Sequence, residues 1–279
     1  MTSMWTTHLI SVDGDVVVKR FRSWARGEHR REWQGLTLLA AYAPGLAAVP
    51  VRADLDARPP TVVMSRVPGA PLGPGPLAPA QVDALAGAVI RMHRAVPPGV
   101  LAGASEAGWP PGTALAGVRR MARDVTAPQE DALLAGAYRA VVAWLACGWS
   151  DRAAVARVPV VFGHGDGNPA NFLWDGGQVR VVDFEDAGRS DRAVELAEFV
   201  EHLGVWLTGQ VTAGPFLERF DLGPGERERT HGFRRLFAAY WFLRLLGAGP
   251  EQDGRNPPGT LPRQAARVLD LLDSPAPPS

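Results

Sequence analysis

The segment PGAPLGPGPLAP, from Pro68 to Pro79, constrains the fold more than any other stretch of this chain. Proline has no backbone N–H to donate, and glycine loses more conformational entropy on ordering than other residues do. A stretch rich in both therefore holds no regular helix or strand. We predict a front lobe of residues 1–67, a linker of residues 68–78 and a back lobe of residues 79–279.

The front part has the pattern of a small antiparallel sheet with one helix. Short runs of β-forming residues cover 8–13, 15–21, 49–51 and 61–67. The first two runs meet at Asp13-Gly14, a dipeptide that favours a tight hairpin turn. Between the second and third runs, residues 28–41 carry apolar side chains at nearly helical spacing, which predicts a helix packed on the sheet.

The back part is mainly helical. Helical patterns cover residues 81–96, 129–147, 193–207, 227–246 and 263–272. Short β-type runs interrupt them at 159–162, 172–174 and 179–184. The Pro-rich and Ser-rich residues 274–279 have the composition of a disordered end. The whole pattern predicts an α+β fold.

The charge balance and the cysteine content exclude several classes of protein. With 29 basic and 29 acidic residues the formal net charge is zero, so no overall basic field attracts nucleic acid or an anionic membrane. The single cysteine, Cys147, excludes an internal disulfide and a cysteine-based zinc cluster. No segment is apolar for about 18 residues, the length that spans a bilayer. We therefore expect a cytoplasmic protein without nucleic-acid or membrane partners.

Residues 161–188 hold the richest set of reactive side chains. Asp166 lies in a Gly-rich loop after a β-type run, Asn171 follows five positions later, and Asp183 ends the next hairpin. Carboxylate and amide oxygens are ligands that suit Mg²⁺, not Zn²⁺. In phosphoryl transfer one carboxylate orients the attacking hydroxyl, while an Asn oxygen and a second carboxylate hold Mg²⁺ on the phosphates. The pattern therefore indicates phosphoryl transfer.

Lys19 is the only lysine in the chain, although the sequence counts 29 lysines and arginines together. A lysine on a strand can meet triphosphate oxygens as a compact ammonium, whereas a guanidinium is broader and planar. Such a lysine needs a carboxylate to orient it. We predict Glu32 for this role in preference to Glu28, because Glu32 lies within the better-defined part of the helical pattern.

These motifs resemble those of the aminoglycoside phosphotransferases and related small-molecule kinases. HGDGNPAN is similar to their HGDxxxxN catalytic loop, and VDFEDAG is similar to their metal-binding segment. VVVKR followed by REWQGLTLLA resembles their lysine strand and glutamate helix, and VVMSRVPG resembles the strand that connects their lobes. The order and spacing agree from about residue 8 to residue 205.

The resemblance implies a bilobal protein-kinase-like fold and an ATP- and Mg²⁺-dependent transfer of phosphate to a small-molecule hydroxyl. Asp166 would orient and deprotonate that hydroxyl, and Asn171 and Asp183 would coordinate Mg²⁺. Lys19 would hold the α- and β-phosphates, with Glu32 behind it.

The resemblance also implies contacts in the connecting strand and near the metal. Met64 would border the adenine, and the carbonyl of Ser65 and the amide of Val67 would hydrogen-bond it. Glu185 would act as an indirect metal ligand through water.

The chain departs from the family at its beginning. Family members start with a further strand and a loop that covers the triphosphate, whereas only MTSMWTT precedes the first recognisable strand here. Three interpretations stay open: the start lies upstream, or Ser3, Thr6 and Thr7 make a shortened cover, or nucleotide is held weakly. The departure motivates an alternative hypothesis, a kinase-like nucleotide-binding protein with little or no catalytic activity.

Acidic residues recur at helical spacing after the predicted metal-binding segment. Glu195, Glu198 and His202 recur in this way, and Glu201 is adjacent. They form either the solvated side of an amphipathic helix or an acidic wall, with Glu198, Glu201 and His202, that binds a cationic acceptor. The acceptor itself stays open among aminoglycoside, macrolide and peptide antibiotics, choline-like alcohols and sugars.

His164 is expected to be structural, hydrogen-bonding behind the loop, and not to transfer a proton. A third hypothesis, a metal-dependent hydrolase built on His164 and Asp166, lacks the histidine-rich ligand set that it needs.

Overall fold

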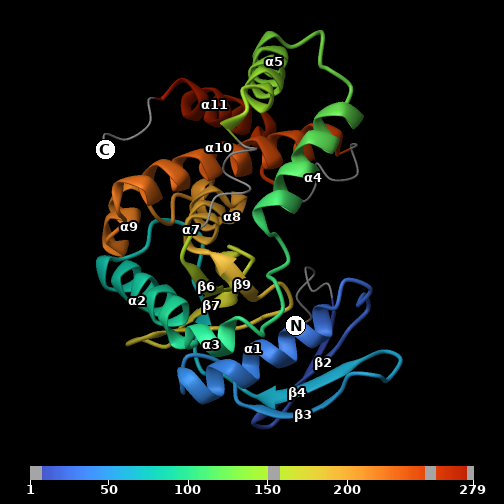
Figure 1. Ribbon diagram of the computed structural model, residues 1–279, viewed down its shortest axis with the longest axis vertical. Coiled ribbons are helices and arrows are strands. Elements are labelled where there is room, and N and C mark those ends of the chain that lie inside the picture. The colour runs from blue at the N-terminus through green and yellow to red at the C-terminus, as the bar shows by residue number, and fades with distance from the viewer. Residues whose placement is uncertain (1–7, 150–157, 249–255, 275–279) are drawn as a thin grey trace. The chain divides into compact units, whose positions relative to one another are not determined.

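A computed structural model describes residues 8–149, 158–248 and 256–274 of the chain (Figure 1). The chain divides into two compact units. The first comprises Met1–Trp109 and Pro159–Glu195, and the second comprises Pro110–Val158 and Leu196–Ser279. The α+β class is confirmed. Both the predicted linker, residues 68–78, and the reactive segment, residues 161–188, lie within the first unit.

The front of the first unit is a four-stranded antiparallel sheet. Its strands are β1 (Leu9–Asp13), β2 (Val16–Arg20), β3 (Pro50–Asp54) and β4 (Thr61–Ser65), in the spatial order β1-β2-β4-β3. Gly14 makes the β1–β2 turn with a φ of 57°, which glycine adopts without steric penalty. The register places Lys19 of the interior strand β2 opposite Val62 of β4.

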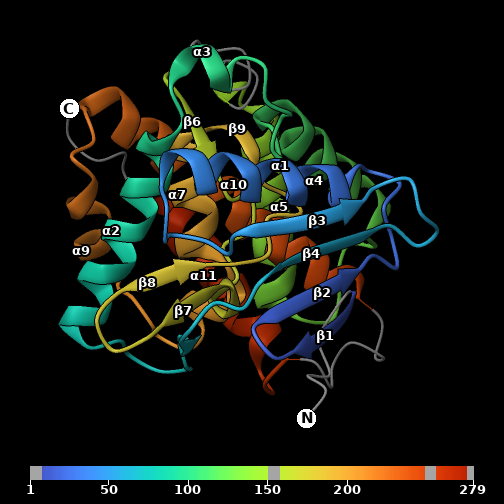
Figure 2. The same cartoon turned by 90° about the horizontal axis from the view of Figure 1, so that it is seen from below.

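Helix α1 (Glu28–Tyr42) runs alongside β3 and β4 (Figure 2). Leu36 and Leu39 on its inner face are almost fully buried. Gly35 allows the helix to lie close to Phe184, since a Cβ at Gly35 would be only 2.9 Å from the Cβ of Phe184. This close packing fixes the inner face of α1, which includes Glu32.

Two smaller sheets complete the strands of the first unit. One contains β5 (Ala70–Pro71), β7 (Phe172–Trp174) and β8 (Val179–Val181), and the other contains β6 (Val160–Gly163) and β9 (Gly188–Asp191). The same unit contains α2 (Pro79–Ala95), α3 (Pro98–Leu101) and the 3₁₀ turn η1 (Pro169–Asn171). Strand β5 corrects the prediction that the Pro- and Gly-rich segment holds no regular element. It is the edge strand of its sheet, a position in which proline is tolerated.

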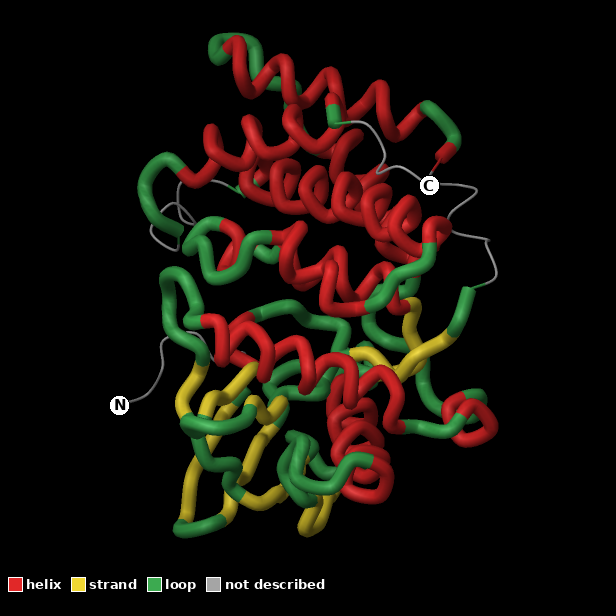
Figure 3. The backbone as a smooth tube through the Cα atoms, turned by 90° about the vertical axis from the view of Figure 1, so that its left-hand side faces the viewer, coloured by secondary structure: helices red, strands yellow, loops and turns green. Residues whose placement is uncertain are grey.

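The second unit is helical, because every strand among the described residues belongs to the first unit (Figure 3). It contains α4 (Pro111–Asp124), α5 (Ala132–Ala146), α8 (Leu203–Trp206), α9 (Ala213–Leu217), η2 (Glu218–Phe220), α10 (Pro224–Gly247) and α11 (Thr260–Asp273). Helix α7 (Arg192–Glu201) begins in the first unit and ends in the second. The predicted helix over residues 193–207 is interrupted at His202, which has a ψ of 134° and whose Nδ1 accepts a hydrogen bond from the Gly204 amide.

The helices of the second unit are joined by specific buried contacts. Nε2 of the fully buried Gln264 on α11 donates to the carbonyl of Ala238 on α10 at 2.8 Å. Gly232 on α10 faces the Trp149 ring, and a Cβ at Gly232 would lie 1.8 Å from that ring. Any larger residue at position 232 would therefore displace the tryptophan.

Some predictions fall outside the described residues. They are the triphosphate cover formed by Ser3, Thr6 and Thr7, and the disordered end at residues 275–279. Among the described helices, none has both the length and the apolar character that crossing a membrane requires.

Candidate active site

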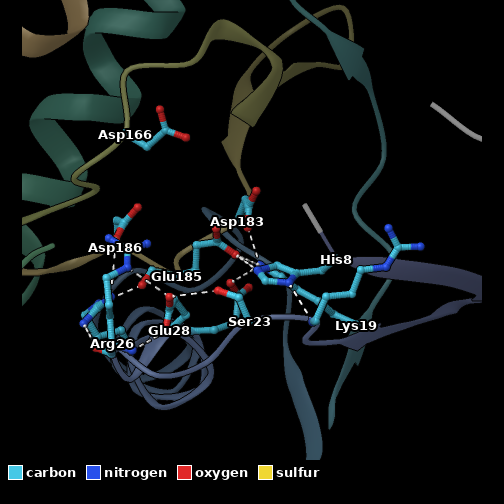
Figure 4. Close-up of polar contacts among 12 residues, drawn as sticks. His8, Lys19, Ser23, Arg26, Glu28, Asp166, Asp183, Glu185 and Asp186 are labelled. Atoms are coloured by element: carbon cyan, nitrogen blue, oxygen red, sulfur yellow. Dashed lines mark hydrogen bonds and ion pairs between the residues drawn. The ribbon is translucent and has the colours of Figure 1, made fainter. Parts of the chain in front are cut away.

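The ammonium of Lys19 lies among carboxylates in the first unit (Figure 4). Lys19 is 3% exposed, and its Nζ lies 2.8 Å from Oε2 of Glu32 and 2.9 Å from Oε2 of Glu185. Asp183 forms a further ion pair and hydrogen bond with the same Nζ. The ring of Phe21 lies on another side, with its centroid 4.8 Å from Nζ. The only lysine of the chain is therefore held at the centre of an acidic cluster.

The carboxylates decide the charge state of Lys19. Burial alone would lower its pKa, but the nearby charges of Glu32, Asp183 and Glu185 outweigh burial and raise the pKa above its ordinary value. The side chain is therefore an ammonium throughout the physiological pH range. A permanent positive charge at this point is what binding to phosphate oxygens requires.

Glu32 on α1 is the buried partner of Lys19, and Glu28 is not. Burial raises the pKa of Glu32, and the Lys19 charge opposes this effect. Oε1 of Glu32 is buried and has no hydrogen-bond partner among the described residues. Glu28 instead accepts hydrogen bonds from the backbone N and the Nε of Arg26, at 2.9 and 3.1 Å. The structure thus brings together the pair that the sequence analysis preferred.

Asp183 follows β8 and has an unusual backbone conformation. Its φ is 69°, in the left-handed region that non-glycine residues rarely adopt. Such a conformation has an energetic cost and is found most often where function requires a side chain to point in one direction. The side chain is 41% exposed, so its carboxylate remains accessible while it contacts Lys19.

His8 and Glu185 form a second pair beside Lys19. Nε2 of His8 lies 2.6 Å from Oε2 of Glu185, and Nδ1 of His8 accepts a hydrogen bond from the Arg22 amide at 3.1 Å. Burial alone would raise the pKa of Glu185, but His8 and Lys19 lower it to about 2. Glu185 is therefore an anion at neutral pH. The sequence analysis assigned no role to His8, because nothing along the chain links it to residue 185.

Asp166 and Asn171 form a separate group on the catalytic loop, and Figure 4 shows Asp166 apart from the cluster around Lys19. Oδ2 of Asp166 accepts a hydrogen bond from Nδ2 of Asn171, and Oδ1 accepts one from the Asn168 amide, both at 3.0 Å. The Asp166 carboxylate is therefore oriented from two sides. Since Nδ2 of Asn171 bonds Asp166, Oδ1 is the atom of Asn171 that can ligate a cation. Asn168 has a local turn role, because its Oδ1 caps η1 by accepting a hydrogen bond from the Ala170 amide.

Glu195 and His164 fix this loop from behind. Oε2 of Glu195 accepts hydrogen bonds from the amides of His164 and Gly165, at 2.8 and 3.1 Å, and Oε1 accepts one from Ser190 at 2.5 Å. The ring nitrogens of His164 lie 2.8 Å from the Asp166 carbonyl and 2.9 Å from the Val182 carbonyl. His164 thus joins the loop that carries Asp166 to Val182, the residue before Asp183, in agreement with the structural role expected of it. The helical spacing of Glu195 was visible in the sequence, but its contact with the loop was not.

Arg31 on α1 holds the predicted metal-binding segment, a contact that the sequence alone does not reveal. Its Nε donates to the carbonyl of Glu185 at 2.7 Å, and its Nη2 contacts Oδ1 of Asp186 at 3.3 Å. A third bond, from Nη1 to the Arg26 carbonyl at 2.7 Å, fixes the guanidinium. Among many exposed arginines, no sequence signal distinguishes this one.

The predicted adenine contacts lie at the end of β4. Met64 is 7% exposed, and Ser65 is fixed by a bond from its amide to the Val49 carbonyl at 2.8 Å. Val67 is half-buried and follows Arg66, whose amide donates to the Asp15 carbonyl at 2.7 Å. Their contact with a base stays a prediction.

The predicted acceptor residues belong to the second unit. Glu201 is fully buried, and both its carboxylate oxygens are bonded by Arg234 and Arg267. This burial contradicts its predicted place in a wall open to an acceptor, since a buried carboxylate needs such partners. Glu198 and His202 are half-buried and stay predicted acceptor contacts. The ring of His202 packs edge-on against Trp241, with the ring centroids 5.0 Å apart.

The acidic cluster has the donors that Mg²⁺ prefers. Glu32, Asp183 and Glu185 each offer one oxygen, and these oxygens all lie within 4.8 Å of one another. Since these carboxylates surround a single ammonium, negative charge is in excess when they are ionised. The unpartnered Oε1 of Glu32 points to the same deficit of positive charge. Hard oxygen donors with excess negative charge suit a divalent cation, so these residues fit the predicted metal.

Comparison with known proteins identifies the fold. The choline/ethanolamine kinase family protein from Mesorhizobium loti superposes with a TM-score of 0.67 at 19% identity, over 97% of this chain and 87% of that one. Aminoglycoside phosphotransferase APH(3'')-Id from Streptomyces rimosus gives a TM-score of 0.54 at 20% identity, over 86% and 88% of the two chains. A spectinomycin phosphotransferase, solved with ADP and spectinomycin, gives 0.57 at 12% identity, over 99% and 88%. The chain therefore has the protein-kinase-like fold of these enzymes.

Comparison by sequence gives two results. None of the curated proteins matches the chain. The model of the phosphotransferase enzyme family, abbreviated APH, matches residues 6–233, which include both the acidic cluster and the catalytic loop. The chain belongs to this phosphotransferase enzyme family.

Proposed function

We propose that the protein transfers the γ-phosphate of ATP to a hydroxyl group of a small molecule, with Mg²⁺ as the cofactor. The observation that carries this proposal is the pairing of Lys19 with Glu32 beside Asp183, in the same unit as the oriented Asp166 and Asn171. Membership of the phosphotransferase enzyme family supports the reaction class.

Lys19 would bind the nucleotide phosphates. Its ammonium is permanently charged, and the 2.8 Å contact with Glu32 holds it from the buried side. The contact with Asp183 lies on the accessible side, since Asp183 is 41% exposed. In the complex, phosphate oxygens would replace Asp183 as the partner of Lys19, which leaves that carboxylate for the metal. Glu32 thus maintains the position of the ammonium during this exchange.

Asn171 and Asp183 would hold Mg²⁺ directly, and Glu185 would contact it through water. Bound Mg²⁺ neutralises charge on the phosphates and supports their alignment for transfer. The low pKa of Glu185, about 2, keeps this residue anionic for that purpose. Arg31 holds the backbone on which Glu185 and Asp186 are carried.

Asp166 would orient the acceptor hydroxyl and take its proton. The hydrogen bonds from Asn168 and Asn171 fix the carboxylate before the acceptor binds, so little reorientation is needed in the transition state. Glu195 and His164 keep the loop that carries Asp166 in place. The bonds to Asp166 use side-chain and backbone donors of the same short loop, which makes its geometry largely local.

The proposed contacts with the nucleotide base and with the acceptor are based on the resemblance to the family. Met64, Ser65 and Val67 would surround the base, and Glu198 and His202 would contact the acceptor. The similar structures include enzymes named for choline, aminoglycosides and spectinomycin, so alcohols with a cationic group are the first acceptors to test. The proposed use of ATP and the single cysteine agree with action in the cytoplasm.

The test is a phosphoryl-transfer assay with the full-length protein. ADP formation and ³¹P NMR of the product would be measured with ATP or GTP, Mg²⁺, and a panel of choline, ethanolamine, aminoglycosides and spectinomycin. Asp166→Ala is expected to lower turnover by about 10²-fold or more, because the acceptor loses its general base. Asp124→Asn, at an exposed site on α4, removes a carboxylate elsewhere and is expected to leave turnover unchanged.

Two outcomes would contradict the proposal. Unchanged turnover in folded Asp166→Ala would remove the role of this residue. Nucleotide-dependent thermal stabilisation without transfer to any acceptor of the panel would favour a nucleotide-binding protein without catalysis.

A further inference from the structure

A cavity with both polar and apolar lining lies wholly within the second unit, between α9, α10 and α11. Its volume is about 710 Å³, and it is lined by Thr230, His231, Arg234, Arg267, Leu222 and Leu271 among others. None of Lys19, Asp166 and Asp183 lines it, and all three belong to the other unit. The cavity is of the size that holds small organic ligands.

Two guanidinium groups on the cavity wall share a single carboxylate. Nε of Arg234 donates to Oε1 of Glu201 at 2.7 Å, while Arg267 donates to both oxygens of Glu201 at 2.8 and 2.9 Å. Glu201 is fully buried. Two positive charges therefore face one negative charge at this part of the wall.

Arg234 keeps hydrogen-bond donors for a ligand. Only its Nε is engaged, since its terminal nitrogens bond no acceptor among the described residues. The two terminal nitrogens of a guanidinium match the geometry of a carboxylate or a phosphate group. The hydrogen bond from Nε to Glu201 fixes the plane of the Arg234 guanidinium group before a ligand binds.

Two residues that line the cavity also have a buried polar atom without a partner among the described residues. Thr230 is 1% exposed, and its Oγ1 has no hydrogen-bond partner among the described residues. A helical threonine ordinarily bonds a carbonyl one turn back, so the free hydroxyl is unusual. Nε2 of His231 is likewise buried without a partner. An unpaired buried polar group destabilises the protein, and a ligand that pairs with it removes this cost.

His231 is neutral and can pair with a hydroxyl group. Burial and the guanidinium groups of Arg235 and Arg234 lower its pKa to about 4, while a bond to the Ser274 backbone opposes this effect. Nε2 of the neutral ring can pair with a hydroxyl group in either tautomer, because a hydroxyl group both donates and accepts.

The helices that form the cavity are fixed to each other. Nε of Arg235 on α10 donates to the Leu271 carbonyl on α11 at 2.9 Å, and Gln264 bonds Ala238 across the same helix pair. Leu222 and Leu271 add apolar surface between the polar groups. The cavity is therefore preformed, which lowers the entropy cost of binding.

The charged residues that line the cavity differ in their exposure to solvent. Glu218, Asp270 and Arg227 line the rim and are exposed, so solvent screens them. Arg234 and Arg267 are less accessible, with side chains 15% and 25% exposed. An anion is therefore attracted more strongly to the inner wall than it is repelled at the rim.

We propose that this cavity binds a small hydroxylated organic anion, whose carboxylate or phosphate group pairs with Arg234. Thr230 and His231 bond the hydroxyl groups of the ligand, and the leucines contact its carbon skeleton. The site is separate from the proposed phosphoryl-transfer site, and its occupancy does not depend on that function.

Calorimetric titration of the full-length protein, without nucleotide and at constant ionic strength, tests the proposal. The probes are glycerol 3-phosphate, glycerate, inorganic phosphate and glycerol. Glycerol 3-phosphate or glycerate is expected to bind more tightly than inorganic phosphate, and glycerol is expected not to bind. The first two probes distinguish a phosphate ligand from a carboxylate ligand.

Thr230→Val tests the role of the hydroxyl group most directly, because it removes this group and keeps the shape of the side chain. It is expected to raise the Tm of the ligand-free protein, since an unpaired buried polar atom is lost, and to weaken binding several-fold. Thr113→Val, at an exposed site on α4, should change neither quantity. Arg234→Gln is expected to weaken binding at least about tenfold, whereas Arg120→Gln on exposed α4 should not.

The proposal is overturned if none of the anions binds at millimolar concentration, or if inorganic phosphate binds as tightly as the hydroxylated anions. It is also overturned if Arg120→Gln weakens binding as much as Arg234→Gln, because the attraction is then a general effect of charge. Where Arg234→Gln does not fold by circular dichroism, Thr230→Val decides, and unchanged affinity in that variant contradicts the proposed site.

Discussion

The ammonium of Lys19 lies 2.8 Å from the carboxylate of Glu32, and both side chains are almost completely buried. A charged pair removed from water is costly unless its geometry and further partners compensate. Here the further partners are Asp183 and Glu185 on the accessible side. The pair is better explained by a requirement for charge at this point than by a contribution to stability.

Replacement of Lys19 by arginine tests whether the compact shape of the ammonium matters. Lys19→Arg is expected to lower kcat/KM for ATP by about 10²- to 10³-fold. Lys19 is only 3% exposed, so the broader guanidinium group cannot make the same contacts in its place. Arg20→Lys, on the exposed side of the same strand, is the matched control and should have little effect. Steady-state kinetics of both variants decide, and full activity in Lys19→Arg contradicts the assignment.

Glu195 should affect turnover more than nucleotide binding. Glu195→Ala removes the acceptor for the His164 and Gly165 amides, so Asp166 loses its fixed position and kcat is expected to fall about 10- to 100-fold with a similar KM for ATP. Glu195→Gln can still accept from those amides and can donate to Ser190, so it should retain more activity. Equal losses in the two variants, or a change confined to KM, would argue against a positioning role.

Arg31 should control metal affinity through the backbone of Glu185. Arg31→Lys keeps the charge but cannot bond the Glu185 carbonyl and Asp186 at once, so the Mg²⁺ concentration at half-maximal rate is expected to rise about tenfold. Arg30→Lys is the matched control, because the Arg30 side chain is 58% exposed and its ion-pair partner within the described part of the chain is the exposed Asp56. A Mg²⁺ titration of both variants measures this, and identical curves would exclude the role.

His93 should make the free energy of unfolding depend on pH. Burial, with a smaller contribution from Arg192, lowers its pKa from 6.5 to about 3, and both ring nitrogens lack partners among the described residues. The unfolded chain therefore binds a proton more readily between these pH values. Stability is fully present above pH 6.5 and falls as the pH decreases towards 3, by roughly 1.4 kcal/mol per pH unit.

His93→Leu is expected to lower the slope of the unfolding free energy, measured by urea unfolding between pH 7 and pH 4, by roughly 1.4 kcal/mol per pH unit below pH 6.5. His231, whose pKa is lowered to about 4, leaves a slope of the same sign and similar size down to about pH 4, which a His231→Leu variant isolates. A His93→Leu protein with the slope of the parent would contradict the proposed burial of a neutral ring.

Structural features that depend on residues close together in the sequence can be predicted from local patterns. Features that depend on residues far apart in the sequence cannot. The hairpin at Asp13-Gly14 involves neighbours in sequence, and the dipeptide predicts it. The hydrogen bonds of Asp166 with Asn168 and Asn171 are also local, but the motif predicts roles for Asp166 and Asn171 and not these bonds. The break at His202 is local too, but it requires a side-chain cap that hydrophobic spacing does not encode.

Contacts between distant segments could not be derived in this way. Arg31 reaches Glu185, and His8 reaches the same residue, across most of the first unit's sequence. Glu201 has the spacing of a solvent-facing residue, but α10 and α11 cover it. In each case the tertiary arrangement, not the local propensity, decides the partner.

The surroundings of Lys19 have a consequence for chemical labelling. Since the chain has one lysine, an amine-directed acylating reagent can modify only this side chain and the terminal amine. Three acidic neighbours keep the amine protonated and therefore unreactive. The rate at which mass spectrometry detects a modified Lys19 would thus report how often this amine leaves its acidic surroundings, and a single peptide would carry the whole signal.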